Sequence, residues 1–184
     1  CDWSSDVCSS DLGDYCTVAQ KTDGSLWAWG YNNYGQLGDG TAVNATLPKQ
    51  IGTSAWLSAA AGSAHVVAIK SNGTLWTWGY NNSGQLGDGT TTNRSTPVQI
   101  GTASNWASVA AGADFTLAVK TDGTLWGWGK NNYNQLGNGT YMNTSTPVQI
   151  GTETNWKTLE AGNFHTLAIK TNGTLWAWGR NNYG

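Results

Sequence analysis

The chain has 184 residues, with nine Lys or Arg against eleven Asp or Glu, and its formal net charge is −2. This near-neutral balance excludes strong electrostatic capture of DNA, RNA or an acidic membrane. No apolar stretch approaches the length of a membrane span. Composition and charge thus exclude these classes without indicating a fold.

The first twelve residues, 1–12, match nothing in the rest of the chain. They resemble the conceptual translation of a sequencing adapter, and we interpret them as a non-native, adapter-derived segment. A genuine Ser/Asp-rich leader is the alternative. Without this segment the chain carries nine basic and eight acidic residues, and Cys16 is its single cysteine, so we expect neither a disulfide framework nor a cysteine metal site.

Residues 13–184 consist of a repeat of about fifty residues. The segment Asp-Gly-Ser-Leu-Trp-Ala-Trp-Gly at 23–30 returns almost unchanged at 72–79, 122–129 and 172–179, with periods of 49, 50 and 50 residues. The repeat starts and stops in the middle of a unit, so we expect both ends to be cut. The units are a partial unit 13–51, two complete units 52–100 and 101–150, and a partial unit 151–184.

One unit, 101–150, predicts four short strands and shows no helical periodicity. In chain order the expected strands are 106–112, 115–120, 124–129 and 147–150. The second and third form a hairpin, and Asp122-Gly123 between them favours a type I′ turn, in which both central residues have positive φ. Pro147 is expected at the first residue of the fourth strand, where no ladder hydrogen bond is needed from it. Four antiparallel strands in fifty residues are typical of a β-propeller blade.

The alternation within the third strand also predicts how the blades pack. Trp126 and Trp128 point to one face of the sheet, and Leu125 and Gly127 point to the other. The residue at the Gly127 position is small in every unit, so a wide indole face can meet a narrow face of the next blade. An indole buries 150–250 Å², and packing therefore explains the tryptophan pairs.

The combined motif of one unit resembles that of a known family. Ala-Gly-x-x-His-Thr-Leu-Ala-(Ile/Val)-Lys-x-(Asp/Asn)-Gly-Thr-Leu-Trp-x-Trp-Gly-x-Asn-x-x-Gly-Gln-Leu-Gly-x-Gly-Thr resembles the regulator of chromosome condensation repeat over the whole of 13–184. The resemblance implies a seven-bladed propeller of about 350 residues, of which this chain would hold about 3.5 blades. We therefore expect an all-β fold, a partial β-propeller. The Trp-rich style resembles the bacterial, often secreted branch, which implies an extracellular or cell-surface location.

The resemblance does not fix the function, because the family includes an exchange factor for the small GTPase Ran, an ultraviolet photoreceptor and a β-lactamase inhibitor. The photoreceptor motif Gly-Trp-Arg-His-Thr is not matched at 62–66, 112–116 or 162–166. The contact loops of the exchange factor cannot be placed on any residue of this sequence, so none is carried over.

No residue pattern predicts catalysis. His65 and His165 occupy the family's histidine position, but Cys16 and Phe115 replace it in the other units, which indicates packing. Asp39 and Asp88 lie in Gly-Asp-Gly-Thr, where the third unit has Asn, which favours a turn over calcium binding. No nucleophile elbow, P-loop or repeated carboxylate pair occurs. We expect no enzyme, no cofactor and no metal.

The positions at which the units disagree predict a binding surface. They lie after each Trp-x-Trp-Gly, are rich in Tyr and Arg, and would project from one side of the scaffold. The candidate residues are Tyr31, Tyr34, Tyr80, Arg94, Lys130, Tyr133, Tyr141 and Arg180. Neutral drift of solvated loops is the competing explanation. We expect a non-enzymatic scaffold that binds a protein partner; the alternatives are a carbohydrate-binding propeller for a surface glycan and an exchange-factor-like regulator. We expect no nucleic acid partner and no membrane span.

Overall fold

The computed structural model describes residues 7–182, with side chains from residue 13 onward. These residues form antiparallel sheets and no helix, so the described chain has no helix that could cross a membrane. The first sheet contains β1 (Val7–Leu12), β2 (Cys16–Lys21), β3 (Leu26–Gly30) and β4 (Ala45–Gln50). The second contains β5 (Trp56–Ala61), β6 (His65–Lys70), β7 (Leu75–Gly79) and β8 (Arg94–Gln99).

The remaining sheets continue the same pattern. The third sheet contains β9 (Trp106–Ala111), β10 (Phe115–Lys120), β11 (Leu125–Gly129) and β12 (Thr144–Gln149). The described part of the fourth contains β13 (Trp156–Ala161), β14 (His165–Lys170) and β15 (Leu175–Gly179). Within each sheet, strands that are consecutive in sequence pair with one another. The four strands predicted in the unit 101–150 are therefore present: the second has the predicted bounds, the first and third differ by one residue at one end, and the fourth begins three residues earlier.

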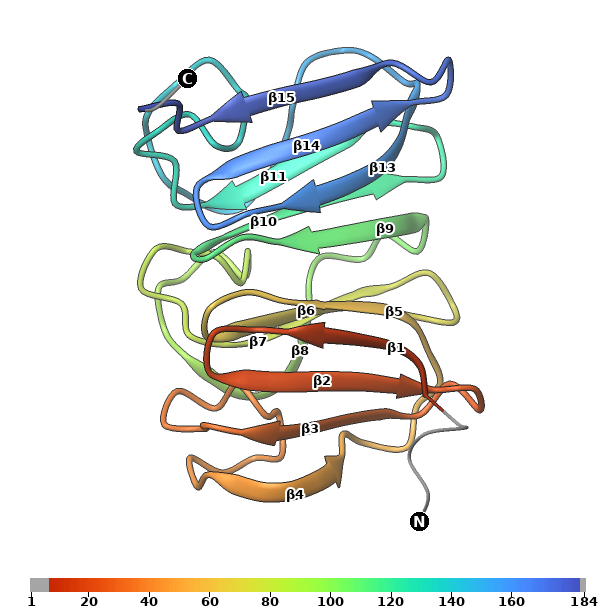
Figure 1. Ribbon diagram of the computed structural model, residues 1–184, viewed down its shortest axis with the longest axis vertical. Coiled ribbons are helices and arrows are strands. Elements are labelled where there is room, and N and C mark those ends of the chain that lie inside the picture. Colours follow the sequence, from red (N-terminus) through yellow and green to blue (C-terminus); the bar gives the residue numbers. More distant parts are fainter. Residues whose placement is uncertain (1–6, 183–184) are drawn as a thin grey trace.

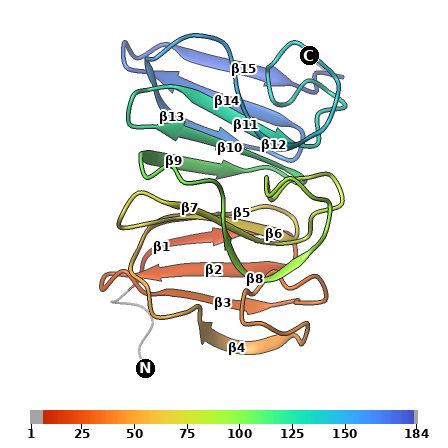
Figure 2. The ribbon, with the colours of Figure 1, turned by 180° about the vertical axis from the view of Figure 1, so that it is seen from behind.

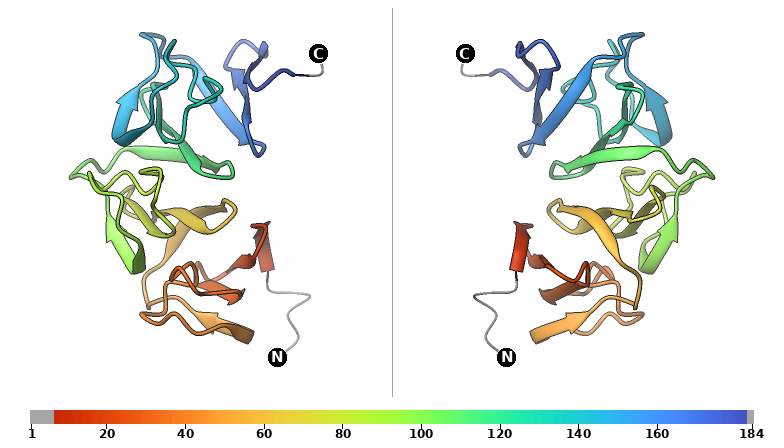
Figure 3. Two further views of the ribbon diagram at one scale, coloured as in Figure 1. Left: turned by 90° about the vertical axis from the view of Figure 1, so that its left-hand side faces the viewer. Right: turned by 90° about the vertical axis from the view of Figure 1, so that its right-hand side faces the viewer.

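The four sheets stack in chain order (Figure 1). Viewed from the side they follow an arc, and the first and last described strands, β1 and β15, lie on its open side (Figure 3). The inner strands β1, β5, β9 and β13 face the viewer in Figure 1, and the outer strands β8 and β12 come forward in the view from behind (Figure 2). The fold is an all-β partial β-propeller, as the sequence predicts.

Strand β1 lies in the segment that we interpret as adapter-derived. Its backbone pairs with β2, with an irregularity between Val7 and Ser9, and it occupies the inner position that β5 and β9 hold in the next two sheets. Residues 1–6 of that segment lie outside the described residues. The origin of the segment remains an interpretation.

The hairpin turn differs from the predicted type I′. Gly123 has a φ of 77°, but Asp122 does not have a positive φ, since Asn134 is the only described non-glycine residue that does. The Gly123 amide donates to the Lys120 carbonyl (2.9 Å), and the Lys120 amide donates to the Thr124 carbonyl (3.0 Å). This is a type I turn followed by a left-handed glycine. Asp122 is favoured because its Oδ1 accepts from the amide (3.0 Å) and hydroxyl (2.7 Å) of Thr124.

The prediction for Pro147 is also wrong, because β12 begins three residues earlier, at Thr144. Its pairing with β11 is irregular: Val148 lies opposite Gly127, and Thr144 lies opposite Gly129. Pro147 falls within this irregular stretch of an outer strand. A residue without an amide proton is tolerated there, because edge strands and bulges leave donors without a ladder partner.

Neighbouring sheets pack through the second tryptophan of each pair. Trp128 is fully buried in one cluster with Val67, Ile69 and Leu75 of the second sheet. Its Nε1 donates to the backbone carbonyl of Gln85, 2.9 Å away. The same bond joins Trp78 to Gln36 and Trp178 to Gln135. The wide indole face therefore meets the aliphatic face of the preceding sheet, as the sequence predicts.

A lysine at the end of each second strand lies against the first tryptophan of the pair. Lys120 Nζ lies 4.0 Å from the ring centroid of Trp126 and 4.9 Å from that of Trp106. Lys70 and Lys170 each lie between the two corresponding indoles in the same way. These cation–π contacts explain a basic residue at the strand end in every unit; sequence analysis did not identify them.

Candidate interaction surface

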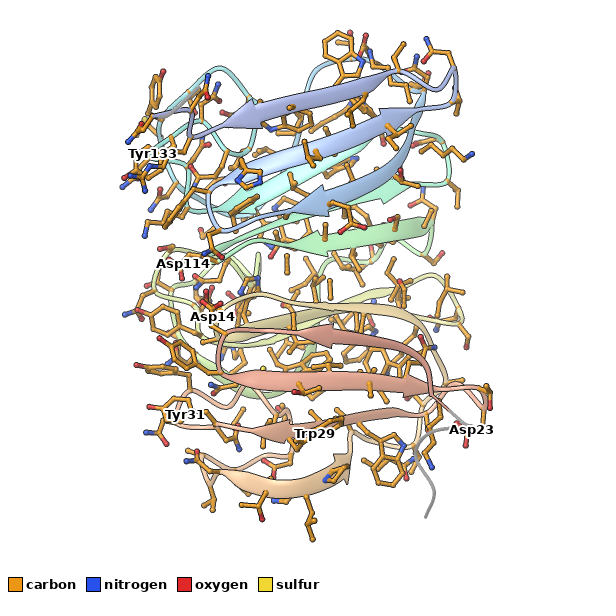
Figure 4. All side chains as sticks on the ribbon, in the orientation of Figure 1. Asp14, Asp23, Trp29, Tyr31, Asp114 and Tyr133 are labelled. Atoms are coloured by element: carbon orange, nitrogen blue, oxygen red, sulfur yellow. The ribbon has the colours of Figure 1, made fainter. Side chains whose placement is uncertain are left out.

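The predicted binding residues gather at one edge of the arc. We call this edge the loop rim; it consists of the tips 13–15, 62–64, 112–114 and 162–164 and of the loops 31–44, 80–93, 130–143 and 180–182. Figure 4 shows Tyr31, Asp14, Asp114 and Tyr133 along this edge and Asp23 at the opposite edge. Because each third strand runs toward the rim, residues after Trp-x-Trp-Gly emerge there in every unit.

Each long loop of the rim is organised around one buried asparagine. Asn81 Nδ2 donates to Oδ1 of Asp88 (3.2 Å) and to the carbonyls of Thr90 and Thr92 (3.1 Å each). Its Oδ1 accepts from the amide of Leu86 (2.9 Å). Asn32 and Asn131 play the same role. This role was not predicted from the sequence, although the repeated Asn-Asn was its signal.

A cluster of four tyrosines covers the rim over the first two sheets. Ring centroids lie 5.8 Å apart between Tyr15 and Tyr31, 6.1 Å between Tyr31 and Tyr34, and 4.7 Å between Tyr34 and Tyr80. Tyr15 and Tyr34 are exposed, by 58% and 39%. We call these residues the tyrosine cluster. Sequence analysis predicted three of them and missed Tyr15, which occupies the variable tip position of Ala64, Asp114 and Phe164.

A second cluster lies over the last two sheets. The guanidinium carbon of Arg180 lies 5.1 Å from the ring centroid of Tyr133 and 5.5 Å from that of Phe164. The two rings are 5.6 Å apart in an edge-to-face arrangement. Tyr133 and Arg180 are thus brought together from different units. Phe164 was not predicted, because it belongs to the tip rather than to the loop after the tryptophans.

The other predicted residues have separate surroundings. Lys130 Nζ pairs with Asp114 Oδ2 at 3.1 Å, between the two aromatic clusters. Arg94 pairs with Asp88 at 2.7 Å, so its charge helps to hold its own loop. Tyr141 is 70% exposed in the loop 130–143. The structure therefore places all eight candidates on the rim or at the start of an outer strand, but only some of them in clusters.

The loop aspartates act as turn residues in the structure. Asp39 Oδ1 accepts from the amide (3.0 Å) and hydroxyl (2.7 Å) of Thr41, and its Oδ2 lies 2.7 Å from Lys49 Nζ. Burial raises the pKa of Asp39, but hydrogen bonds from Lys49, Thr41 and Asn32 outweigh burial and lower the pKa to about 2. Asn138 makes the same turn bonds in the third unit. Among the described residues no three His, Cys, Asp or Glu side chains are grouped so as to hold a metal ion.

His65 behaves as a packing residue. It is fully buried, and its Nε2 lies 3.0 Å from Oγ1 of Thr116 on the next sheet. Burial lowers its pKa to about 4, although the charge of Asp114 opposes this shift. The imidazole is therefore neutral near pH 7. Phe115 is buried at the equivalent place in the third sheet, which agrees with the packing role.

Comparison with known proteins decides the family. A family model described as RCC1-like domain matches residues 3–184. The chain belongs to the RCC1-like domain family. The match begins at residue 3, within the segment 1–12. This RCC1-like domain also resembles solved propellers along almost its whole length.

Two solved structures illustrate the similarity. Prp20p from Saccharomyces cerevisiae is 26% identical, with a TM-score of 0.82, over 95% of this chain and 44% of Prp20p. Human WBSCR16 is 22% identical, with a TM-score of 0.83, over 94% of this chain and 47% of its own. The RCC1-like domain thus spans less than half of either chain. The Prp20p structure is described together with its binding to Gsp1p and histones, and another structure shows Prp20 bound to Kap60.

Proposed function

We propose that this RCC1-like domain is a non-enzymatic scaffold that binds a protein partner through the loop rim. The observation that carries the proposal is the tyrosine cluster, in which side chains from two sheets form one partly exposed aromatic surface. Tyr and Arg are the residues that most often supply binding energy at protein interfaces. Membership of the RCC1-like domain family agrees with an interaction or regulatory role.

The support beneath the cluster favours a preformed surface. The loop that carries Tyr31 and Tyr34 is held by buried Asn32, and the Tyr34 amide donates to Oε1 of buried Gln36 (3.0 Å). Since a rigid surface loses little conformational entropy on binding, such support raises affinity. The rings are tilted against one another by 49°, 67° and 54°, which gives an uneven surface suited to a shaped protein epitope.

The partner is expected outside the cell or on its surface. This part of the proposal rests on the Trp-rich style of the repeat. It predicts that partners are recovered from the extracellular and surface fractions of the source organism and not from its cytosol.

The test is affinity capture with the immobilised chain, followed by binding measurements with the purified partner. The variant carries Tyr31→Ala and Tyr80→Ala, and the control carries Leu47→Ala, an exposed side chain on the outer strand β4, outside the loop rim. We expect the double variant to bind at least about ten-fold more weakly, as removal of interface hot spots does, and the control to bind normally. Circular dichroism of all three proteins verifies the fold.

Three results would contradict the proposal. Equal binding by the double variant would remove the tyrosine cluster as the site. Competition by free sugars, with binding on a glycan array, would establish the carbohydrate alternative instead. Accelerated nucleotide release from a small GTPase would establish the exchange-factor alternative.

A further inference from the structure

The loop rim contains three equivalent junctions between successive sheets. In each, a buried glutamine of one unit accepts, at its backbone carbonyl, a hydrogen bond from the second tryptophan of the following third strand. The same backbone bond closes every tip: Tyr80 N donates to Ala64 O (2.8 Å), Lys130 N to Asp114 O (2.8 Å) and Arg180 N to Phe164 O (2.9 Å). The chain can therefore be compared with itself, one junction against another.

The middle junction contains a carboxylate supplied by the chain. Asp114 Oδ2 lies 3.1 Å from Lys130 Nζ, and Asp114 Oδ1 lies 3.5 Å from Nε2 of Gln85. One carboxylate thus faces a cation from the third-strand end and an amide donor from the preceding unit. Asp114, a side chain of the protein itself, therefore shows that this position accommodates a carboxylate.

The junction before the fourth sheet keeps both kinds of donor but lacks the carboxylate. Gln135 is fully buried, and its Nε2 has no hydrogen-bond partner among the described residues. Arg180 replaces Lys130 and pairs with no described carboxylate, and Phe164 replaces Asp114. With the Asn182 amide oxygen turned toward Arg180, that oxygen lies 3.1 Å from both Nε and Nη2.

Arg180 is well prepared for an incoming anion. Its guanidinium lies against the rings of Tyr133 and Phe164, which restrain it without using its hydrogen-bond donors. A guanidinium has five N–H donors, so the contacts with Asn182 leave Nη1 available. An arginine held in place loses less entropy when it binds a carboxylate in the paired geometry that the two groups share.

We propose that Tyr133, Gln135, Phe164 and Arg180 form a carboxylate site that binds an Asp or Glu side chain of the protein partner. This inference rests on the proposed function and names the chemistry of one contact. The partner carboxylate takes the place that Asp114 takes in the middle junction, between the guanidinium and the buried amide. The first junction has Tyr80 and Ala64 at these positions, hence no cation, and it does not bind a carboxylate.

The first test uses a peptide probe, acetyl-Gly-Glu-Glu-Gly-amide (the Glu peptide), and a control in which Gln replaces both Glu residues (the Gln peptide). In NMR spectra that resolve arginine side chains, the Glu peptide at millimolar concentration shifts the Arg180 Nε–Hε resonance in a saturable way, and the Gln peptide does not. Arg180→Gln weakens binding of the Glu peptide at least about five-fold. Arg94→Gln is the matched control, because Arg94 already pairs with Asp88. A shift no larger than that caused by the Gln peptide overturns the proposal, and so does tighter binding of glucuronate than of the Glu peptide.

The second test supplies the carboxylate from within the chain. Phe164→Asp places an acid at the position of Asp114, where it occupies the site, so the NMR response to the Glu peptide disappears. The introduced carboxyl is expected to titrate below its ordinary pKa, and Arg180→Gln in the same chain returns the pKa toward that value. This pKa readout reports on the site independently of any partner. A carboxyl that titrates normally with Arg180 present contradicts the site.

Binding of the captured partner separates the two proposals. If Arg180→Gln weakens partner binding about ten-fold and an Asp→Asn or Glu→Gln change in the partner adds no further loss, both proposals hold. If Tyr31→Ala with Tyr80→Ala abolishes binding while Arg180→Gln does not, the rim binds the partner and the carboxylate site is wrong. If neither variant changes binding, the proposed function itself fails.

Discussion

Asn81 illustrates how much of the rim depends on single buried side chains. It is fully buried. Its side-chain amide accepts a hydrogen bond from the Leu86 amide and donates to the carbonyls of Thr90 and Thr92. These backbone groups belong to a loop without regular structure, so no strand partner can satisfy them. Since buried polar groups without partners are costly, the asparagine determines the loop's conformation.

Replacing Asn81 with Ala is expected to destabilise the protein by about 3 kcal/mol, because several buried backbone groups lose their partner. The measurement is urea unfolding followed by tryptophan fluorescence. Asn82→Ala is the matched control, since Asn82 is exposed and adjacent. A loss of the same size in both variants would mean that the hydrogen bonds of Asn81 are not the cause.

The Asp39 carboxylate makes the stability of the fold depend on pH. Its folded pKa, about 2, lies below the ordinary value of 3.8, so its carboxylate stabilises the fold above about pH 4 and this contribution is lost as the pH falls toward 2. Lys49→Met is expected to raise the pKa of Asp39, and Lys157→Met is expected to leave it unchanged. NMR titration of the Asp39 carboxyl carbon measures both. A wild-type pKa near 3.8 would contradict the assignment.

At the scale of the element, sequence reasoning identified the hairpin but not its turn. Asp-Gly is compatible with two turn geometries, because glycine at the second position suits both. The choice depends on the preceding residue: Asp122 has no positive φ, and its side chain accepts hydrogen bonds from Thr124 in this geometry. The position of Pro147 was missed for a related reason, since a bulge in the outer strand leaves no mark in the alternation of side chains.

Two glycines, each with a positive φ, allow backbone strain to be separated from steric crowding. Gly123 (φ 77°) and Gly151 (φ 65°) both lie in the left-handed region, so Ala costs about 1 kcal/mol at either. A Cβ at Gly123 would also collide with the Thr154 carbonyl oxygen, whereas nothing lies near a Cβ at Gly151. Gly123→Ala is therefore expected to cost at least about 1 kcal/mol more than Gly151→Ala in urea unfolding. Equal costs would show that the linker at Thr154 moves aside.

At the scale of the whole molecule, the repeat predicted the stacked sheets but not the junctions between them. Trp128 and the Gln85 carbonyl lie 43 residues apart in sequence, and Arg180 and Tyr133 belong to different units. Periodicity describes one unit at a time, whereas these contacts depend on how far each sheet is rotated against the next. The variable positions were found because they break the repeat. Their grouping into the tyrosine cluster and the carboxylate site required the structure.

The fourth sheet shows what an uncovered blade face looks like. Val67, Ile69 and Leu75 of the second sheet are fully buried, because the third sheet covers them. The equivalent residues of the fourth sheet are Leu167, Ile169 and Leu175, exposed by 38%, 39% and 66%. Such an apolar patch favours association: full burial of an exposed Leu or Ile contributes about 1.5–3 kcal/mol, and covering these partly exposed side chains contributes a corresponding fraction of that.

The 184-residue chain alone is therefore expected to self-associate through this face. Ile169→Thr with Leu175→Lys is expected to shift the chain toward monomer in sedimentation velocity, because a charge and a hydroxyl cannot be buried there without partners. Leu47→Lys is the matched control: Leu47 is 75% exposed, but it lies on the outer strand β4, away from the fourth sheet. Association that persists in the double variant but disappears in the control would place the contact on the outer strands. A wild-type chain that is monomeric at all concentrations would contradict this prediction. It would show that the buried contacts between neighbouring sheets stabilise the chain even with the apolar face of the fourth sheet exposed to water.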